Sequence, residues 1–185
     1  MTKKSVLVIL NPSAGSKNPP LRLFNNLFHK ANFNWDLVIT KERCDGIRSA
    51  QKAIKDGYDI VAAYGGDGTV MEVASGLIDV DIPMAILPGG TGNILSIELG
   101  IPQNLEEACK LITQPEKSKI RSVDLGVTND EKVPAFALRA SVGLEAAMLE
   151  GTDRELKERY GIFAYIMGRS EEHTLNSSHV SQSRM

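Results

Sequence analysis

Short apolar runs alternate with amphipathic segments between residues 5 and 113, and this alternation restricts the folds open to the chain. The amphipathic segments carry apolar residues at the spacing of a helix. A repeated strand–helix order predicts an α/β domain with a doubly wound, mainly parallel sheet. The predicted strands are SVLVIL at 5–10, WDLVIT at 35–40, DIVAAY at 59–64 and PMAILP at 83–88.

Start and stop signals mark the predicted helices. Gly57 is a suitable stop, because glycine adopts the left-handed conformation that often ends a helix. Asn104, with Glu107 three residues later, is a variant of the capping box that starts a helix. The predicted helices cover residues 21–28, 46–57, 70–77, 93–100 and 104–113.

Composition limits the class of protein. Hydrophobic residues make up 42% of the 185 residues, which is enough for a packed core, and the formal net charge of -2 argues against a nucleic-acid-binding protein. Cys44 and Cys109 have no metal-type spacing, and a reducing compartment suits them. With no signal peptide or membrane-spanning run, we expect a cytoplasmic protein that contacts membranes only peripherally.

The pattern changes after about residue 119, which predicts more than one structural unit. Residues 122–128 and 133–143 are expected to be strands of a hairpin, and residues 153–168 a helix. We therefore predict an α/β domain at 1–122 and part of a second, β-rich domain at 123–168. The polar residues 169–185 are expected to be a tail that is disordered or not native to the gene.

Polar turns directly follow the four predicted strands. They are NPSAG at 11–15, Thr40, GGDGT at 65–69 and PGGTGN at 88–93. Ligands of parallel α/β sheets bind beyond the carboxyl ends of the strands. We therefore expect the four turns to converge at one edge of the sheet and to form a binding site there.

The glycine turns predict a phosphate site. A glycine turn between a strand and a helix lets backbone amides approach a phosphate, and the helix dipole favours the negative charge. The hydroxyl of Thr69 could add a hydrogen bond. The glycines concerned are Gly65, Gly66 and Gly68 in the first turn, and Gly89, Gly90 and Gly92, beside Thr91, in the second.

Two side chains in these turns have more than one interpretation. Asp67 would repel a phosphate unless a divalent cation lay between them, so it could face Mg²⁺; it could instead cap the helix that follows it. Asn93 could cap the next helix or hold the neighbouring loop.

Taken in order and spacing, NPSAG, Thr40, GGDGTVMEV, PGGTGN and VDLG resemble the catalytic domain of the diacylglycerol kinase superfamily, which includes bacterial lipid kinases and sphingosine kinases. The resemblance runs from about Ser5 to Gly168. GGDGT also occurs in NAD kinases. The NPSAG and PGGTGN turns are therefore what separates the diacylglycerol kinase superfamily from NAD kinases in this comparison. The resemblance implies a fold shared by NAD kinases and diacylglycerol kinases, and phosphoryl transfer from ATP, with Mg²⁺, to a lipid hydroxyl.

The resemblance also implies roles for particular residues. Asp67 and Asp124 would belong to an acid–water–Mg²⁺ network. The chain departs from the family pattern at Ile94, Met71 and Glu145, where many members have aspartate, asparagine and aspartate. ATP would be held by Asn11, Pro12, Ser13, Ala14, Gly15, Thr40, Gly65, Gly66, Asp67, Gly68, Thr69, Val70, Met71, Gly90, Thr91, Gly92 and Asn93.

In the family, a second, β-sandwich domain supplies the general base and one side of the lipid cleft. This chain stops after the first strands and one helix of that domain, so we assign no catalytic residue and expect nucleotide binding without lipid phosphorylation. The expected partner is a lipid at a membrane surface. Two alternatives remain: a NAD kinase-like enzyme, and a nucleotide-binding module without catalysis. Ile94, which stands where many family members have aspartate, favours the second alternative.

Overall fold

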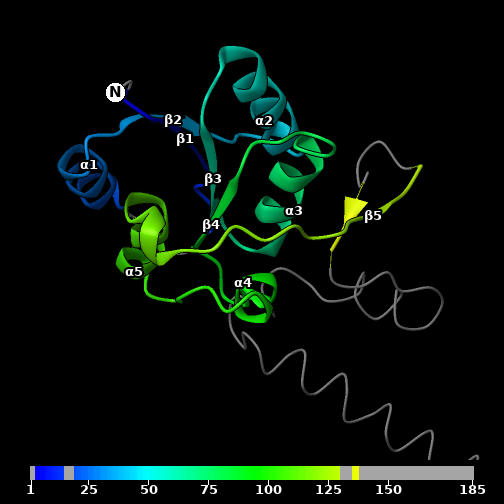
Figure 1. Cartoon of the computed structure of the whole chain (residues 1–185). Helices are drawn as coiled ribbons and strands as arrows, with labels where there is room; N and C mark the ends of the chain where they lie inside the picture. Colours follow the sequence, from blue (N-terminus) through cyan, green and yellow to red (C-terminus); the bar gives the residue numbers. More distant parts are fainter. Residues whose placement is uncertain (1–2, 15–18, 130–134, 138–185) are drawn as a thin grey trace, which may run out of the picture. The chain divides into compact units, whose positions relative to one another are not determined.

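The computed structural model describes residues 3–14, 19–129 and 135–137 (Figure 1). All of them lie in the first of two units of the chain, residues 1–139. Gly15, Glu145, the predicted helix at 153–168 and the tail at 169–185 lie outside the described residues, as does most of the predicted strand at 133–143. The domain boundary at 122 stays a prediction.

Four parallel strands form a sheet in the order β2–β1–β3–β4, which confirms the predicted α/β fold. At the centre, Ile9 of β1 pairs with Val38 of β2 on one side and Ala63 of β3 on the other. Helices cover both faces of the sheet, so the central strands are apolar almost throughout. The strands are β1 (Ser5–Leu10), β2 (Asn34–Ile39), β3 (Ile60–Gly65) and β4 (Met84–Pro88).

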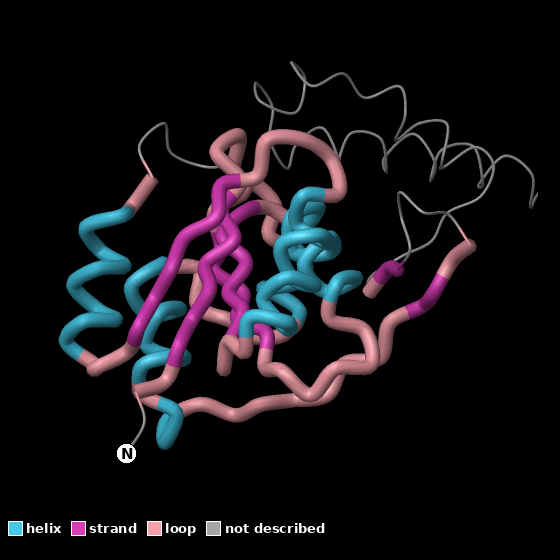
Figure 2. The backbone as a smooth tube through the Cα atoms, turned by 90° about the horizontal axis from the view of Figure 1, so that it is seen from above, coloured by secondary structure: helices cyan, strands magenta, loops and turns pink. Residues whose placement is uncertain are grey.

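Helices flank the sheet on both sides (Figure 2). Gly57 ends α2 with a φ of 76°, and the Asn104 side chain accepts a hydrogen bond from the Glu107 amide at the start of α5, as predicted. The Glu107 carboxylate binds Lys110 at 2.6 Å. The helices are α1 (Leu21–Lys30), α2 (Asp45–Asp56), α3 (Asp67–Gly76), α4 (Ile94–Glu98), α5 (Leu105–Thr113) and the short 3-10 helix η1 (Pro115–Lys117).

The core has two layers because successive residues of a strand point to opposite faces. Val8 packs with α1 and α5 on one face, and Ile9 packs with α2 and α3 on the other. The Tyr64 ring lies edge-on to Phe24, with ring centroids 5.6 Å apart. Burial raises the pKa of Tyr64. Tyr64 is therefore a core residue below the carboxyl edge.

Helix α3 begins three residues earlier than predicted, inside the glycine turn. Gly66 is extended, with φ -89°, and its carbonyl accepts a hydrogen bond from the Val70 amide at 3.1 Å. Asp67, Gly68 and Thr69 therefore form the first turn of the helix. The first amides of a helix have no intrahelical acceptor, so this turn can bind an anion.

The predicted hairpin after residue 122 is present as a short antiparallel pair. Strand β5 (Gly126–Val127) pairs with β6 (Ala135–Phe136), and Gly126 lies opposite Phe136. A Cβ on Gly126 would meet the far end of the Phe136 ring, so a larger residue there would require that ring to shift. Among the described residues, no helix is long and apolar enough to cross a membrane.

Candidate functional site

The carboxyl ends of the four strands meet at one edge, as the strand–turn order predicts. Backbone hydrogen bonds join neighbouring strand ends: Thr40 N to Leu10 O at 2.9 Å, Asn11 N to Tyr64 O at 3.0 Å, and Gly89 N to Gly65 O at 3.0 Å. The four polar turns therefore lie side by side. The predicted convergence is confirmed.

The strand order places a topological switch point between β1 and β3. The chain passes from β1 to β2 on one side, then crosses to β3 on the other side of β1. The loops that follow β1 and β3 consequently leave the sheet in opposite directions. In open α/β sheets this switch point is where ligands bind. Here it lies between the loop that begins at Asn11 and the first turn of α3.

The two glycine turns contact each other through their backbones. A Cβ on Gly90 would lie 2.5 Å from the Cα of Gly66, and a Cβ on Gly89 would lie 2.9 Å from the Tyr64 ring. Gly89 and Gly90 are therefore required by packing inside the protein. Gly68 differs, because a Cβ there would meet no atom of the described residues within 4 Å, apart from its chain neighbours and its own helix backbone. The space beside Gly68 is open to a ligand.

Asn11 joins the first polar turn to the glycine turn after β3. Its Nδ2 donates to Thr69 Oγ1 at 3.0 Å, and its Oδ1 accepts from the Ser13 amide at 2.9 Å. Thr69 is buried, whereas Pro12 and Ser13 are exposed. The structure thus brings together two of the predicted ATP-binding segments, and a half-buried hydrogen bond fixes their separation.

Asp67 caps a helix, but not the helix that follows it in sequence. The N-cap of α3 is Gly66, and Asp67 lies inside α3. Its Oδ2 accepts from Ile94 N at 3.0 Å and its Oδ1 from Leu95 N at 2.9 Å, at the start of α4. The interpretation of Asp67 as a cap of its own helix is therefore wrong. Each carboxylate oxygen keeps a further lone pair, so the Mg²⁺ role stays a prediction.

Asn93 holds the neighbouring loop, which settles its two interpretations. Its Oδ1 accepts from Gly90 N and its Nδ2 donates to Gly90 O, both at 2.9 Å. It makes no side-chain cap to α4 and has φ 50°. Sequence reasoning missed Gln103, whose Nε2 donates to Ser96 Oγ at 2.8 Å and whose Oε1 lies 3.4 Å from Asn93 Nδ2. Nothing in the local sequence marks that contact.

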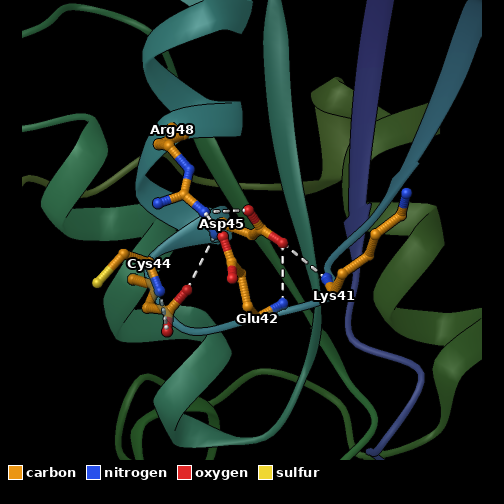
Figure 3. Close-up of polar contacts among 7 residues, drawn as sticks. Lys41, Glu42, Cys44, Asp45 and Arg48 are labelled. Carbon is orange, nitrogen blue, oxygen red and sulfur yellow. Dashed lines mark hydrogen bonds and ion pairs between the residues drawn. The ribbon is translucent and has the colours of Figure 1, made fainter.

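The loop after β2 is held by a carboxylate that sequence reasoning also missed (Figure 3). Asp45 accepts hydrogen bonds from the amides of Lys41 at 2.7 Å and Glu42 at 2.9 Å, and Arg48 contacts it from α2. These bonds, led by the one from Lys41, lower the pKa of Asp45 to about 2. Just before the loop, Thr40 is buried and its Oγ1 lies 3.4 Å from Leu10 O.

The shape of the loop after β2, which Asp45 holds, should depend on pH. Because the pKa of Asp45 falls from 3.8 to about 2 on folding, its contribution to stability is present above pH 3.8 and is lost as the pH falls through about 2. We expect the amides of Lys41 and Glu42 to stay protected down to about pH 3 and to lose protection below it. The NMR chemical shifts of the Lys41 and Glu42 amides, followed as a function of pH, would check this. Titration midpoints near pH 4 for these shifts would contradict it.

The remaining predicted residues occupy several environments. The Val70 side chain belongs to the core, so only its backbone could face a ligand, whereas Met71 is half-buried and packs against the core. Thr91 is exposed, and a Cβ on Gly92 would lie 3.4 Å from Asp67 Oδ2. Asp124 is exposed, and the described part of the chain has no cluster of three or more His, Cys, Asp or Glu that could hold a metal ion. Its role in a metal network stays a prediction.

The fold and the site together define an α/β domain with glycine-rich turns at the carboxyl edge of its sheet. The family model of the diacylglycerol kinase catalytic domain matches residues 5–127. The chain belongs to the diacylglycerol kinase catalytic domain family. This confirms the resemblance drawn from the NPSAG, GGDGT and PGGTGN turns.

Two individual proteins are similar to this chain in sequence. The chain is 34% identical over 188 residues to an uncharacterized protein of Synechocystis sp., covering 94% of this chain and 42% of that protein. It is 33% identical over 165 residues to the lipid kinase YegS of Escherichia coli (strain K12), covering 87% and 53%. The chain thus spans about half the length of these relatives.

A solved structure agrees with the fold. The crystal structure of a diacylglycerol kinase from Bacillus anthracis str. Sterne matches with a TM-score of 0.54 and 36% identity. The match covers 66% of this chain and 42% of that chain.

Proposed function

We propose that this chain binds ATP for phosphoryl transfer to a lipid hydroxyl. The observation that carries the proposal is the first turn of α3, where Gly68 leaves open space beside backbone amides at the sheet switch point. Amides of this kind bind phosphate, because the helix dipole favours an anion and a bare backbone permits close approach. Membership of the family supports a kinase, and the name of the Escherichia coli relative supports a lipid acceptor.

The arrangement of the turns orients the nucleotide in this proposal. The turns with bare glycine backbone follow β3 and β4, whereas the loops that begin at Asn11 and Thr40 follow β1 and β2. The phosphates would lie against Gly68 and the second glycine turn. The nucleoside would then extend across the end of β1 toward Thr40.

A bound Mg²⁺ would fit beside Asp67 and would neutralise phosphate charge during transfer. Mg²⁺ takes one or two carboxylates together with phosphate oxygens and water, so a single aspartate suffices on the protein side. Asp67, held by the α4 amides, is the carboxylate nearest in sequence to the open turn, and Asp124 is the proposed second acid. We assign the general base to neither, and we propose peripheral contact with the membrane that holds the lipid.

The 185-residue chain should bind Mg·ATP weakly, with a Kd on the order of 0.1–1 mM, and any γ-phosphate that it transfers should go to a lipid hydroxyl and not to NAD. Calorimetric titration with ATP, and transfer of labelled γ-phosphate to lipid or to NAD, would check both parts. Absence of saturable ATP binding would contradict the proposal. Label in NAD would favour the soluble-nucleotide kinase, and label in lipid would support a lipid acceptor.

A further inference from the structure

The start of α2 is capped by a side chain from another helix. Glu72, in the middle of α3, accepts hydrogen bonds from Cys44 N at 3.1 Å through Oε1 and from Gly46 N at 2.9 Å through Oε2. Cys44 has a left-handed φ of 67° and provides no side-chain cap of its own. A dashed line in Figure 3 ends at the Cys44 backbone nitrogen, directly beside the loop that Asp45 holds. One oxygen of Glu72 is thus engaged by Cys44, the last residue of the loop after β2, and the other by the first turn of α2.

Glycines let α2 and α3 approach closely enough for this contact. A Cβ on Gly46 would lie 2.7 Å from Glu72 Cβ and 2.9 Å from its Oε2. On the other helix, a Cβ on Gly76 would lie 2.7 Å from Ile47 O and 2.7 Å from Ala50 Cβ. The two helices therefore pack almost backbone to backbone, and Glu72 lies between the α2 start and the α3 backbone.

Glu72 and Asp45 hold the loop after β2 in different ways. Asp45 bonds to Lys41 and Glu42, so it fixes the shape of the loop. Glu72 bonds to Cys44 from α3, so it fixes where the loop lies relative to α3. Because α3 also carries Gly68 in its first turn, one rigid helix relates the loop after Thr40 to the open glycine turn.

We propose that Glu72 is a positioning residue that sets the distance between the loop after Thr40 and the glycine turn of α3. This rests on the proposed function, in which the phosphates bind at the turn and the nucleoside reaches toward Thr40. Glu72 then governs affinity for the nucleoside part of ATP and leaves affinity for the phosphates alone unchanged. A residue that only stabilised the fold would not separate these two affinities.

The test is Glu72→Gln, measured by titration with ATP and with inorganic tripolyphosphate at a temperature where both proteins are folded. Glutamine has nearly the same shape but one acceptor oxygen, so its NH₂ group would face one of the two amide N–H groups. We expect about tenfold weaker ATP binding, with tripolyphosphate affinity changed by less than about twofold. Equal losses for both ligands, or unchanged ATP affinity, would overturn the proposal. Glu116→Gln, an exposed change after α5, is the matched control.

Gly46→Ala tests the same contact without altering any charge. Alanine favours a helix more than glycine does, so in an open position the change would raise the unfolding midpoint. Here the added Cβ would displace Glu72, so we expect a lower midpoint and the same selective loss of ATP affinity. A raised midpoint with unchanged ATP affinity would contradict the role of this contact.

Amide exchange separates this proposal from the proposed function. If the wild-type chain binds neither ATP nor tripolyphosphate, the proposed function fails, and the positioning contact is then judged by the exchange rates of the Cys44 and Gly46 amides. Glu72→Gln should speed that exchange at least about tenfold, whereas Glu116→Gln should not. Unchanged exchange at both amides would overturn the positioning role.

Discussion

Gly90→Ala should destabilise the protein by about 2 kcal/mol or more, as measured by chemical denaturation. The added Cβ would lie 2.5 Å from the Cα of Gly66 and 3.1 Å from its backbone nitrogen. Both are backbone atoms of Gly66, the residue that follows β3, so neither can move aside as a side-chain end can. The two glycine turns would have to separate, and we expect ATP binding to be lost with the stability. A Gly90→Ala protein as stable as the wild type would contradict the close packing of the two turns.

The matched variant is Gly68→Ala, in the first turn of α3. Apart from its chain neighbours and its own helix backbone, no atom of the described part of the chain lies within 4 Å of the position its Cβ would take, and its φ is not left-handed. We therefore expect unfolding free energy to stay the same or to rise by up to about 1 kcal/mol, since alanine is the better helix former. ATP affinity should nevertheless fall at least about tenfold, because the methyl group would occupy the phosphate position. Wild-type ATP affinity in Gly68→Ala would place the phosphates elsewhere.

Asp67→Asn should lower the free energy of unfolding by about 2 kcal/mol, because it replaces a two-oxygen acceptor with a one-oxygen acceptor. The carboxylate accepts the amides of Ile94 and Leu95 together, and the NH₂ group of asparagine would face one of these N–H groups. The negative charge that opposes the positive end of α4 would also be lost. Asp81→Asn, an exposed change before β4, should have little effect in the same denaturation experiment. Equal stabilities for the two variants would contradict the capping role of Asp67.

The same variant separates the capping role of Asp67 from its proposed metal role. ATP binding should be titrated with Mg²⁺ and again with EDTA. If Asp67 also faces Mg²⁺, the wild type should bind ATP more tightly with the metal, and Asp67→Asn should remove most of that gain. If Asp67 only holds α4, the variant should lose affinity equally in both conditions. A metal gain kept in full by Asp67→Asn would refute the metal role.

Much of the fold could be predicted because its causes lie close together in the sequence. The apolar run around Ile9 is continuous since helices cover both faces of its strand, and such runs identify a central parallel strand. Gly57 marked the end of α2 because the required left-handed φ favours glycine within that turn. The position of the site followed in the same way, since strand direction alone brings the four polar turns to one edge.

The first turn of α3 was less predictable, because a glycine-rich turn and the first turn of a helix have the same local sequence. Propensity favours a start after Gly68, since glycine is a poor helix former. Tertiary contacts outweigh that cost: the buried Thr69 side chain receives the Asn11 hydrogen bond, and Asp67 reaches α4 from within the helix. The helix therefore extends through the turn.

By itself, the sequence determined the order of strands and helices, the edge at which the polar turns meet, and the places where bare backbone faces that edge. Only the tertiary structure decided which group each side chain meets. Capping rules reach three or four residues along the chain. The partners of Asp67, Glu72 and Asn11 lie 27, 26 and 58 residues away. Contacts at such separations depend on how helices pack across the sheet, and no local pattern contains that information.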